Sequence, residues 1–237
     1  MAMAMRTVPP VDDRKVIEVP HVRQCYSWDC GLACLSMVLQ HYDIPPKEVY
    51  TKDLDAQQCG ESVWTIDLAC IAARNGIRHR LCTITLGANA EHASKSFYSG
   101  FTRDEKRVNK LFQEAASQSV QVEQRSVAME EVVNHLSTGC LAVVLIDWRY
   151  LECQWCPPNM GRCCFCCMDI GHSGYQGHFI VVCGYNRTKQ HIFYKNPNTS
   201  ESLCCCRFES FEKARKSHGT DEDILFLYKT ERPSASH

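Results

Sequence analysis

A segment that is apolar on nearly every face of a helix, residues 30–41, constrains the fold of this chain more than any other feature. Because the apolar residues do not form a single stripe, the predicted helix has no face suited to water. They are Leu32, Ala33, Cys34, Leu35, Met37, Val38 and Leu39. Such a helix must be buried among other elements, and we expect it to be central.

The chain is long enough to provide that cover. Its 237 residues suffice for one large domain with a sizeable core. We expect a single domain over residues 16–230 that includes a Cys-rich insertion at 151–177. Residues 1–15 are expected to be a flexible lead and residues 231–237 a tail.

The order of the predicted elements indicates an α+β fold. Further helices are predicted from periodicity and capping signals at residues 46–54, 63–74, 104–118, 126–136 and 208–217. Ser62 is the predicted cap of the helix at 63–74, and Ser126 is the predicted cap of the helix that ends near residue 136. Strands are predicted at residues 16–20, 79–85, 120–123, 141–146, 178–185, 192–195 and 224–229. The run 141–146 is continuously apolar, which is typical of a strand covered on both faces. We therefore expect N-terminal helices, with the central helix packed on a mainly antiparallel C-terminal sheet.

The cysteine that begins the central helix, Cys30, is a candidate nucleophile. A helix N-terminus lowers the pKa of a thiol because its unpaired N–H groups and dipole favour the thiolate, which is the reactive form. Gln24 stands six residues earlier. Its amide and the backbone N–H of Cys30 could donate to the oxyanion of a tetrahedral intermediate. The alternative is a buried structural cysteine, the usual state of a free Cys, so partners elsewhere must decide.

Two such partners occur in the second half of the chain. His178 begins the apolar strand 178–185, and Asn196 ends the next predicted strand. If the two strands are adjacent and antiparallel, the Asn196 oxygen can accept from one ring nitrogen of His178 while the other faces Cys30. Taken singly, a histidine at a strand start is usually a satisfied polar residue, and Asn before Pro is usually a turn former. Together with Gln24 they predict a Cys-His-Asn site.

The predicted reaction is hydrolysis or transfer at an amide or thioester carbonyl of a peptide, protein or small molecule. Cys30 would be the nucleophile, His178 the general base and acid, and Asn196 the residue that orients the imidazole. Gln24 would contribute to the oxyanion hole. This mechanism requires no cofactor.

These residues carry a resemblance to a known family. The pattern Gln24-x5-Cys30-Gly31, with His178 opening a strand and Asn196-Pro197 ending the next, resembles the C39-like branch of papain-fold cysteine peptidases. In that branch the last position is usually Asp, whereas Asn196 is similar to the orienting residue of papain. The resemblance implies a papain-like fold. C39-like domains can also be non-catalytic binding modules, which is a third alternative.

Longer segments resemble the guanylyl cyclase domain-containing protein 1 family, to which plant proteins described as guanylyl cyclase 1 belong. The resemblance spans roughly residues 19–228, and the matching segments are 19–24, 28–34, 64–68, 177–182 and 219–225. It implies an alternative activity, the conversion of GTP to cyclic GMP.

A cyclase of the common type needs acidic side chains that hold Mg²⁺ or Mn²⁺ against the triphosphate. The nearest candidates are Asp221, Glu222 and Asp223, with Asp67 and Asp147 farther away in the sequence. The ordinary explanation of the acidic triplet is a solvated turn. The sequence has no Gly-rich phosphate loop of the P-loop type.

The chain has 17 cysteines, which we expect to be mostly reduced thiols because residues 1–13 do not read as a signal peptide. Cys153, Cys156, Cys163 and Cys166 could supply four thiolates to a structural zinc ion. His172 is a further possible ligand, and the run 204–206 could contribute. The alternative is a flexible loop of reduced thiols.

Charge and hydropathy limit the range of partners. The 26 basic and 27 acidic residues nearly balance, so the composition does not favour nucleic acid as a partner. No stretch approaches the roughly 18 apolar residues of a membrane-spanning helix. We expect the protein to lie in the cytoplasm, with the nucleus as an alternative location.

Overall fold

The computed structural model describes residues 13–44, 62–89, 91, 101–156, 174–200 and 203–229, with the side chains of 101–103 left out. The helix predicted at 46–54 and the predicted zinc ligands Cys163 and Cys166 lie outside the described residues, as does His172.

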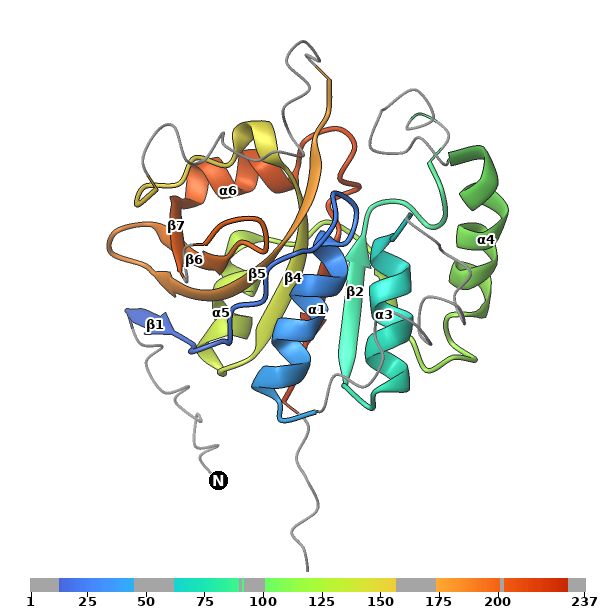
Figure 1. Ribbon diagram of the computed structural model, residues 1–237, viewed down its shortest axis with the longest axis horizontal. Helices are drawn as coiled ribbons and strands as arrows, with labels where there is room; N and C mark the ends of the chain where they lie inside the picture. The colour runs from blue at the N-terminus through green and yellow to red at the C-terminus, as the bar shows by residue number, and fades with distance from the viewer. Residues whose placement is uncertain are drawn as a thin grey trace, which may run out of the picture.

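Within these ranges the chain forms one eight-stranded sheet, which runs through the centre of Figure 1. The strands are β1 (Arg14–Val16), β2 (His79–Thr83), β3 (Val122–Gln124), β4 (Leu141–Asp147), β5 (Gly177–Asn186), β6 (His191–Lys195), β7 (Cys204–Arg207) and β8 (Ile224–Leu227). Their order is β3-β2-β8-β4-β5-β6-β7, and β1 pairs with β5. Among the described strands, β2 and β3 are parallel and all other pairs are antiparallel.

Five α-helices and a short 3-10 helix are found in the described residues. They are α1 (Cys30–His41), α3 (Thr65–Arg74), α4 (Phe101–Glu114), α5 (Met129–Ser137), α6 (Phe208–Arg215) and the 3-10 helix η3 (Trp148–Tyr150). Figure 1 shows α1 and α3 side by side in front of the sheet, where α1 contacts β4 and β5 and α3 contacts β2 and β8. The expected α+β fold with a mainly antiparallel sheet is confirmed.

The central position of α1 is also confirmed. Every residue from Cys30 to Leu39 is buried. Gly31 permits this close packing, because a Cβ at this position would lie 3.1 Å from both Leu68 Cδ1 and Phe179 Cδ2. The glycine therefore lets the first turn of α1 approach α3 and the start of β5 together.

Tertiary contacts move two helix starts away from their predicted caps. Ser62 does not cap α3; instead the Asp67 carboxylate accepts the backbone N–H of Trp64 at 2.8 Å, and the helix begins at Thr65. Ser126 does not cap α5, because its hydroxyl donates to the Glu222 carboxylate. That helix begins at Met129.

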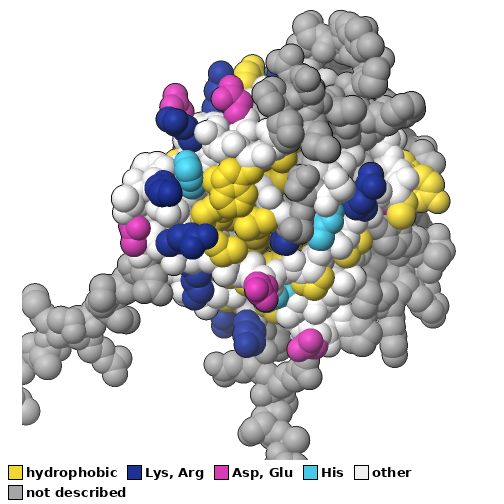
Figure 2. Space-filling model, turned by 60° about the vertical axis from the view of Figure 1, so that its left-hand side comes forward, with side chains coloured by type: hydrophobic (Ala, Val, Ile, Leu, Met, Phe, Trp, Pro, Cys, Tyr) yellow, Lys and Arg dark blue, Asp and Glu magenta, His cyan; other side chains and the backbone are white. Residues whose placement is uncertain are grey.

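The surface carries mixed charges and a few exposed apolar side chains. Figure 2 turns forward the side on which Figure 1 shows β1, β6 and β7, and hydrophobic side chains gather there between basic ones. Trp155, which is 52% exposed, packs against Phe193 with the rings tilted and their centroids 5.4 Å apart. None of the described helices is long and apolar enough to cross a membrane.

Candidate active site at the start of the central helix

The loop that delivers the chain to Cys30 is shaped by Asp29. This buried carboxylate accepts the backbone N–H groups of Cys25 and Tyr26, each at 3.0 Å. It makes no side-chain cap to α1, which begins at the next residue. The loop thereby turns sharply and places Cys30, which is 4% exposed, at the N-terminal end of the helix.

The same loop is fastened to the end of β6. The backbone N–H of Gln24 donates to the carbonyl of Pro197 at 2.8 Å. His21 Nε2 donates to the backbone carbonyl of Asn196 at 2.9 Å. Segments more than 170 residues apart in the sequence therefore meet beside the start of α1.

The side chains of His178 and Asn196 form a buried hydrogen bond. The distance from His178 Nε2 to Asn196 Oδ1 is 2.9 Å. Asn196 Oδ1 also accepts the backbone N–H of Asn198 at 3.0 Å, and because a backbone N–H only donates, the atom facing it is the amide oxygen. The imidazole must therefore donate from Nε2, which makes Nδ1 the basic nitrogen of the neutral ring.

Packing brings the surroundings of Cys30 and His178 together. Gly31 and Phe179, their respective chain neighbours, are in close contact at the point where α1 meets β5. The indole of Trp148 lies edge-on to the His178 ring with centroids 5.1 Å apart. The imidazole is thus held by Asn196 at one nitrogen and packed against an aromatic ring.

Sequence reasoning did not single out Trp148 or His21 for this site. Trp148 could have been found from the antiparallel pairing of the two strands that flank the insertion. Asp147 pairs with Gly177, so Trp148, the residue after β4, lies beside the beginning of β5. The backbone N–H of Trp148 donates to the carbonyl of Gln176 at 2.8 Å and fixes this placement. The sequence carried no comparable signal for His21.

The Gln24 side chain is in the correct region but is engaged elsewhere. Its Nε2 donates to the backbone carbonyl of Tyr26 at 2.7 Å, and its Oε1 is buried without a hydrogen-bond partner among the described residues. For Gln24 to donate to an oxyanion, its amide must leave the Tyr26 carbonyl. Its predicted role stays a prediction.

The acidic residues considered for a cyclase do not converge. Asp221 Oδ1 accepts the Thr85 hydroxyl at 3.0 Å, whereas Glu222 accepts the Ser126 hydroxyl. Asp223 is half-buried as a residue, but its Oδ1 atom is buried and has no hydrogen-bond partner among the described residues. Burial raises the pKa of this carboxyl to about 8.

The two more distant acids have structural partners. Asp67 is buried and pairs with Arg107 in addition to holding the Trp64 N–H. Asp147 is buried as well, and it accepts Arg149 Nη2 at 2.6 Å and the Ser217 hydroxyl at 2.9 Å. Both carboxylates therefore make structural contacts, Asp67 at the start of α3 and Asp147 at the end of β4.

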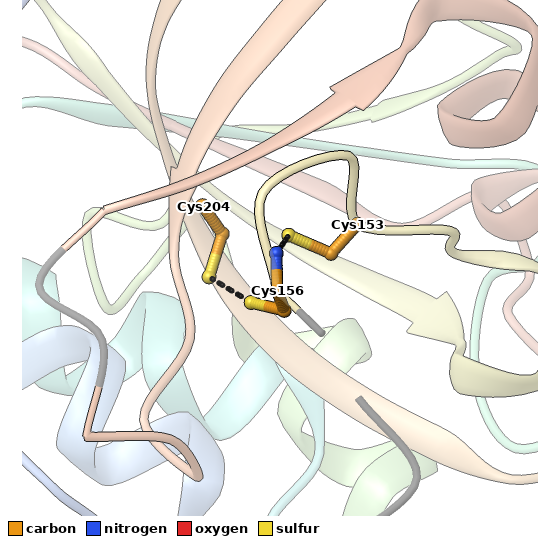
Figure 3. Close-up of side chains that lie close together, drawn as sticks. All are labelled: Cys153, Cys156 and Cys204. Carbon is orange, nitrogen blue, oxygen red and sulfur yellow. Dashed lines mark hydrogen bonds between the residues drawn. The ribbon is translucent and has the colours of Figure 1, made fainter. Parts of the chain in front are cut away.

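A separate group of side chains could bind a metal ion. The Sγ atoms of Cys153, Cys156 and Cys204 all lie within 4.8 Å of one another (Figure 3). A hydrogen bond from the Cys204 thiol, with further help from backbone N–H groups, lowers the pKa of Cys153 below its usual range. Among the described residues this is the one group of three or more His, Cys, Asp or Glu side chains with such convergence.

Comparisons with known proteins give three findings. A family model described as guanylylate cyclase matches residues 19–227. The Arabidopsis thaliana protein Guanylyl cyclase 1 is 34% identical over 214 residues, which cover 89% of this chain and 76% of the plant protein. A solved structure described as a C39-like peptidase from Bacillus anthracis is a more distant match, with 15% identity and a TM-score of 0.45. It covers 92% of this chain and 98% of the other.

Proposed function

The chain belongs to the guanylylate cyclase family, and we propose that it acts as a thiol-dependent hydrolase or transferase at an amide or thioester carbonyl. The observation that carries the proposal is the 2.9 Å hydrogen bond from His178 Nε2 to Asn196 Oδ1. It holds a buried imidazole in one tautomer, with Nδ1 as the basic nitrogen, beside the helix that begins with Cys30.

The reaction follows from these groups. Nδ1 of His178 takes the proton of the Cys30 thiol, and the helix N-terminus stabilises the resulting thiolate. The thiolate attacks the substrate carbonyl carbon, and the carbonyl oxygen becomes an oxyanion. The backbone N–H of Cys30 donates to this oxyanion, as does Gln24 once its amide has left the Tyr26 carbonyl.

Collapse of the tetrahedral intermediate completes the transfer. The carbon–nitrogen or carbon–sulfur bond to the leaving group breaks, and the imidazolium of His178 gives its proton to that group. The acyl group remains on Cys30 as a thioester. Water or another nucleophile, deprotonated by Nδ1, then attacks the thioester and regenerates the thiol. The substrate is a peptide, a protein or a small molecule with such a carbonyl, and no cofactor is required.

The chain offers an internal control for testing the nucleophile. Cys25 is exposed and lies in the loop that leads to Cys30, whereas Cys30 is buried at the start of α1. We expect an iodoacetamide-type probe at mildly acidic pH to label Cys30 faster than Cys25, because only an activated cysteine is substantially thiolate there. Peptide mapping by mass spectrometry measures both rates in one sample. If Cys30 is labelled no faster than Cys25, the activated-nucleophile proposal fails.

A second variant separates activation from mere accessibility. His178→Ala should slow the labelling of Cys30 and leave the labelling of Cys25 unchanged, because only Cys30 depends on the imidazole. Equal slowing at both cysteines would indicate a disturbed loop instead. Far-UV circular dichroism verifies that the variant is folded.

Family membership favours a second candidate, conversion of GTP to cyclic GMP with Mg²⁺ or Mn²⁺. The 34% identical relative is named Guanylyl cyclase 1. In this chain Asp221, Glu222 and Asp223 would be the metal-binding acids, although they have the separate environments described above. This candidate predicts cyclic GMP from GTP, loss of product in Asp221→Ala, and no effect of Cys30→Ala. Absence of product from the metal-supplied protein would remove it.

A third candidate is a binding module that keeps the fold without catalysis. It predicts that Cys30→Ala leaves both the structure and the cellular effect of the protein unchanged. The labelling experiment and a GTP assay on the same preparation distinguish all three candidates.

A further inference from the structure

Three cysteine side chains converge on the side of the sheet that carries β6 and β7. Cys153 and Cys156 lie in the loop after η3, and Cys204 begins β7 (Figure 3). Cys204 is buried and the other two are partly buried. The three sulfurs belong to none of the groups assigned to the thiol mechanism.

The spacing of the sulfurs fits a shared metal ion better than a covalent bond. Cys156 Sγ and Cys204 Sγ are 3.8 Å apart. A disulfide requires about 2.05 Å between its sulfurs. Two thiolates on a tetrahedral zinc ion, with Zn–S bonds of about 2.3 Å, lie about 3.8 Å from each other.

The loop is held in this position by contacts that need no metal. The backbone N–H of Gln154 donates to the Cys205 carbonyl at 2.6 Å, and the Trp155 ring packs at a tilt against Phe193. The backbone N–H of Cys156 donates to Cys153 Sγ at 3.3 Å. Donation of this kind stabilises a ligating thiolate and orients it. The three sulfurs are thus presented together by β6, β7 and the loop itself.

We propose that Cys153, Cys156 and Cys204 bind one zinc ion that fastens the loop after η3 to β7. Soft thiolate ligands select thiophilic ions such as Zn²⁺ over hard cations such as Mg²⁺ or Ca²⁺. Three thiolates fill three of the four positions of a tetrahedral zinc, and a solvent molecule or a further ligand takes the fourth. The site is independent of the Cys30 chemistry.

The first test is the metal content of the full chain purified without chelators. Elemental analysis should find about one zinc ion per chain, and Cys153→Ser and Cys204→Ser should each reduce this below about half. Cys205→Ala, next to Cys204 on the same strand, is the matched control and should retain zinc. So should Cys30→Ala, which separates this proposal from the proposed function.

The second test uses the wild-type chain, so that it does not depend on the folding of a variant. Zinc is removed and Co²⁺ is added in its place. A ligand-to-metal charge-transfer band with the intensity of three thiolates is expected, together with a higher melting temperature than that of the metal-free chain.

Four results would overturn the proposal: a zinc-free preparation that also gives no cobalt–thiolate band, zinc retained in Cys204→Ser, copper in place of zinc, or a disulfide between Cys156 and Cys204 in unreduced peptide maps. Zinc retained in Cys204→Ser would mean that cysteines outside this cluster hold the ion.

Discussion

The amide oxygen of Asn196 accepts two hydrogen bonds, from His178 Nε2 and from the backbone N–H of Asn198. An amide flip would place an NH₂ group against both donors, so the orientation of Asn196 is fixed. Its Nδ2 is buried without a hydrogen-bond partner in the described structure. The side chain therefore serves as an acceptor, at the cost of one unsatisfied donor.

This arrangement predicts different effects for two substitutions of Asn196. Asn196→Ala removes the acceptor and should slow the labelling of Cys30 by about tenfold or more, since a disoriented base loses part of its usual contribution. Asn196→Asp keeps the acceptor and removes the unsatisfied Nδ2. The negative charge of the new carboxylate should raise the pKa of the His178 imidazole. The part of the pH–rate curve for Cys30 alkylation that reflects deprotonation of His178 should therefore move to higher pH.

The measurement is the pH dependence of the Cys30 alkylation rate in the three proteins, with Cys25 as the internal reference. A purely structural role for Asn196 would change stability but leave the shape of the pH profile the same in all three. That result would contradict the orienting role.

Asp223 gives a prediction about stability and pH. Burial raises the pKa of its carboxyl to about 8, and the nearby charge of Asp221 acts in the same direction. The folded state thus binds the proton more tightly than the unfolded chain, whose Asp pKa is about 3.9. Stability should therefore fall as the pH rises between these two values.

The variant Asp223→Asn should remove this dependence. Between pH 5 and pH 8 the wild type should lose about 3 kcal/mol of unfolding free energy that the variant keeps. Urea unfolding at both pH values measures it. Parallel pH dependences in the two proteins would show that Asp223 titrates normally.

At the scale of elements, the predictable parts were those with a strong local pattern. The apolar segment of α1 and the run of β4 required burial on all sides, and both are buried. The starts of α3 and α5 were misplaced because Asp67 and Glu222, rather than the local serines, settle the hydrogen bonds there. β7 was missed because its three consecutive cysteines do not alternate between apolar and polar residues.

The contact of α1 with β5 predicts the effect of Gly31→Ala. The added Cβ would lie 3.1 Å from the side chains of Leu68 and Phe179, which are buried and have little room to move. Overpacking of this kind costs about 1–3 kcal/mol, more than the helix propensity gained by replacing Gly with Ala. We expect lower thermal stability and slower Cys30 labelling.

Gly174→Ala is the control for this substitution, because a Cβ at that position meets nothing within 4 Å. Differential scanning fluorimetry and the labelling assay compare the three proteins. A Gly31→Ala protein as stable and as reactive as wild type would mean that α1 and β5 separate easily.

At the scale of the whole molecule, the sheet unites the two halves of the chain. β8, the last strand, lies between β2 from the first half and β4 from the second. Cys30 from the first half thereby reaches the region of His178 and Asn196.

The pairing of β5 with β6 could be anticipated from the sequence because their connection is short. The convergence of Cys153, Cys156 and Cys204 could not be anticipated. Cys204 lies 48 residues beyond Cys156, and the pairing of β7 with β6 brings the two together.

Glu131 on α5 joins several of these parts. Its carboxylate accepts Arg80 Nη2 from β2 at 2.7 Å, and Arg125 Nη1 and Nη2 from the segment after β3 at 2.8 and 2.6 Å. The hydrogen bonds with Arg125 lower the pKa of Glu131. A lowered folded-state pKa means that the stabilisation is present above the unfolded pKa of about 4.3 and is lost as the pH falls through the folded value.

Glu131→Gln should therefore destabilise the protein at neutral pH by about 1 kcal/mol, a modest value because the group is partly exposed and screened by solvent. The loss should shrink in high salt and at pH values below the folded pKa of Glu131. The rate of Cys30 labelling in the folded protein should stay at the wild-type value, because Glu131 holds the β2–β3 edge and contributes no group to the candidate site. A labelling rate that falls together with stability would instead show that this edge of the sheet controls the geometry at Cys30.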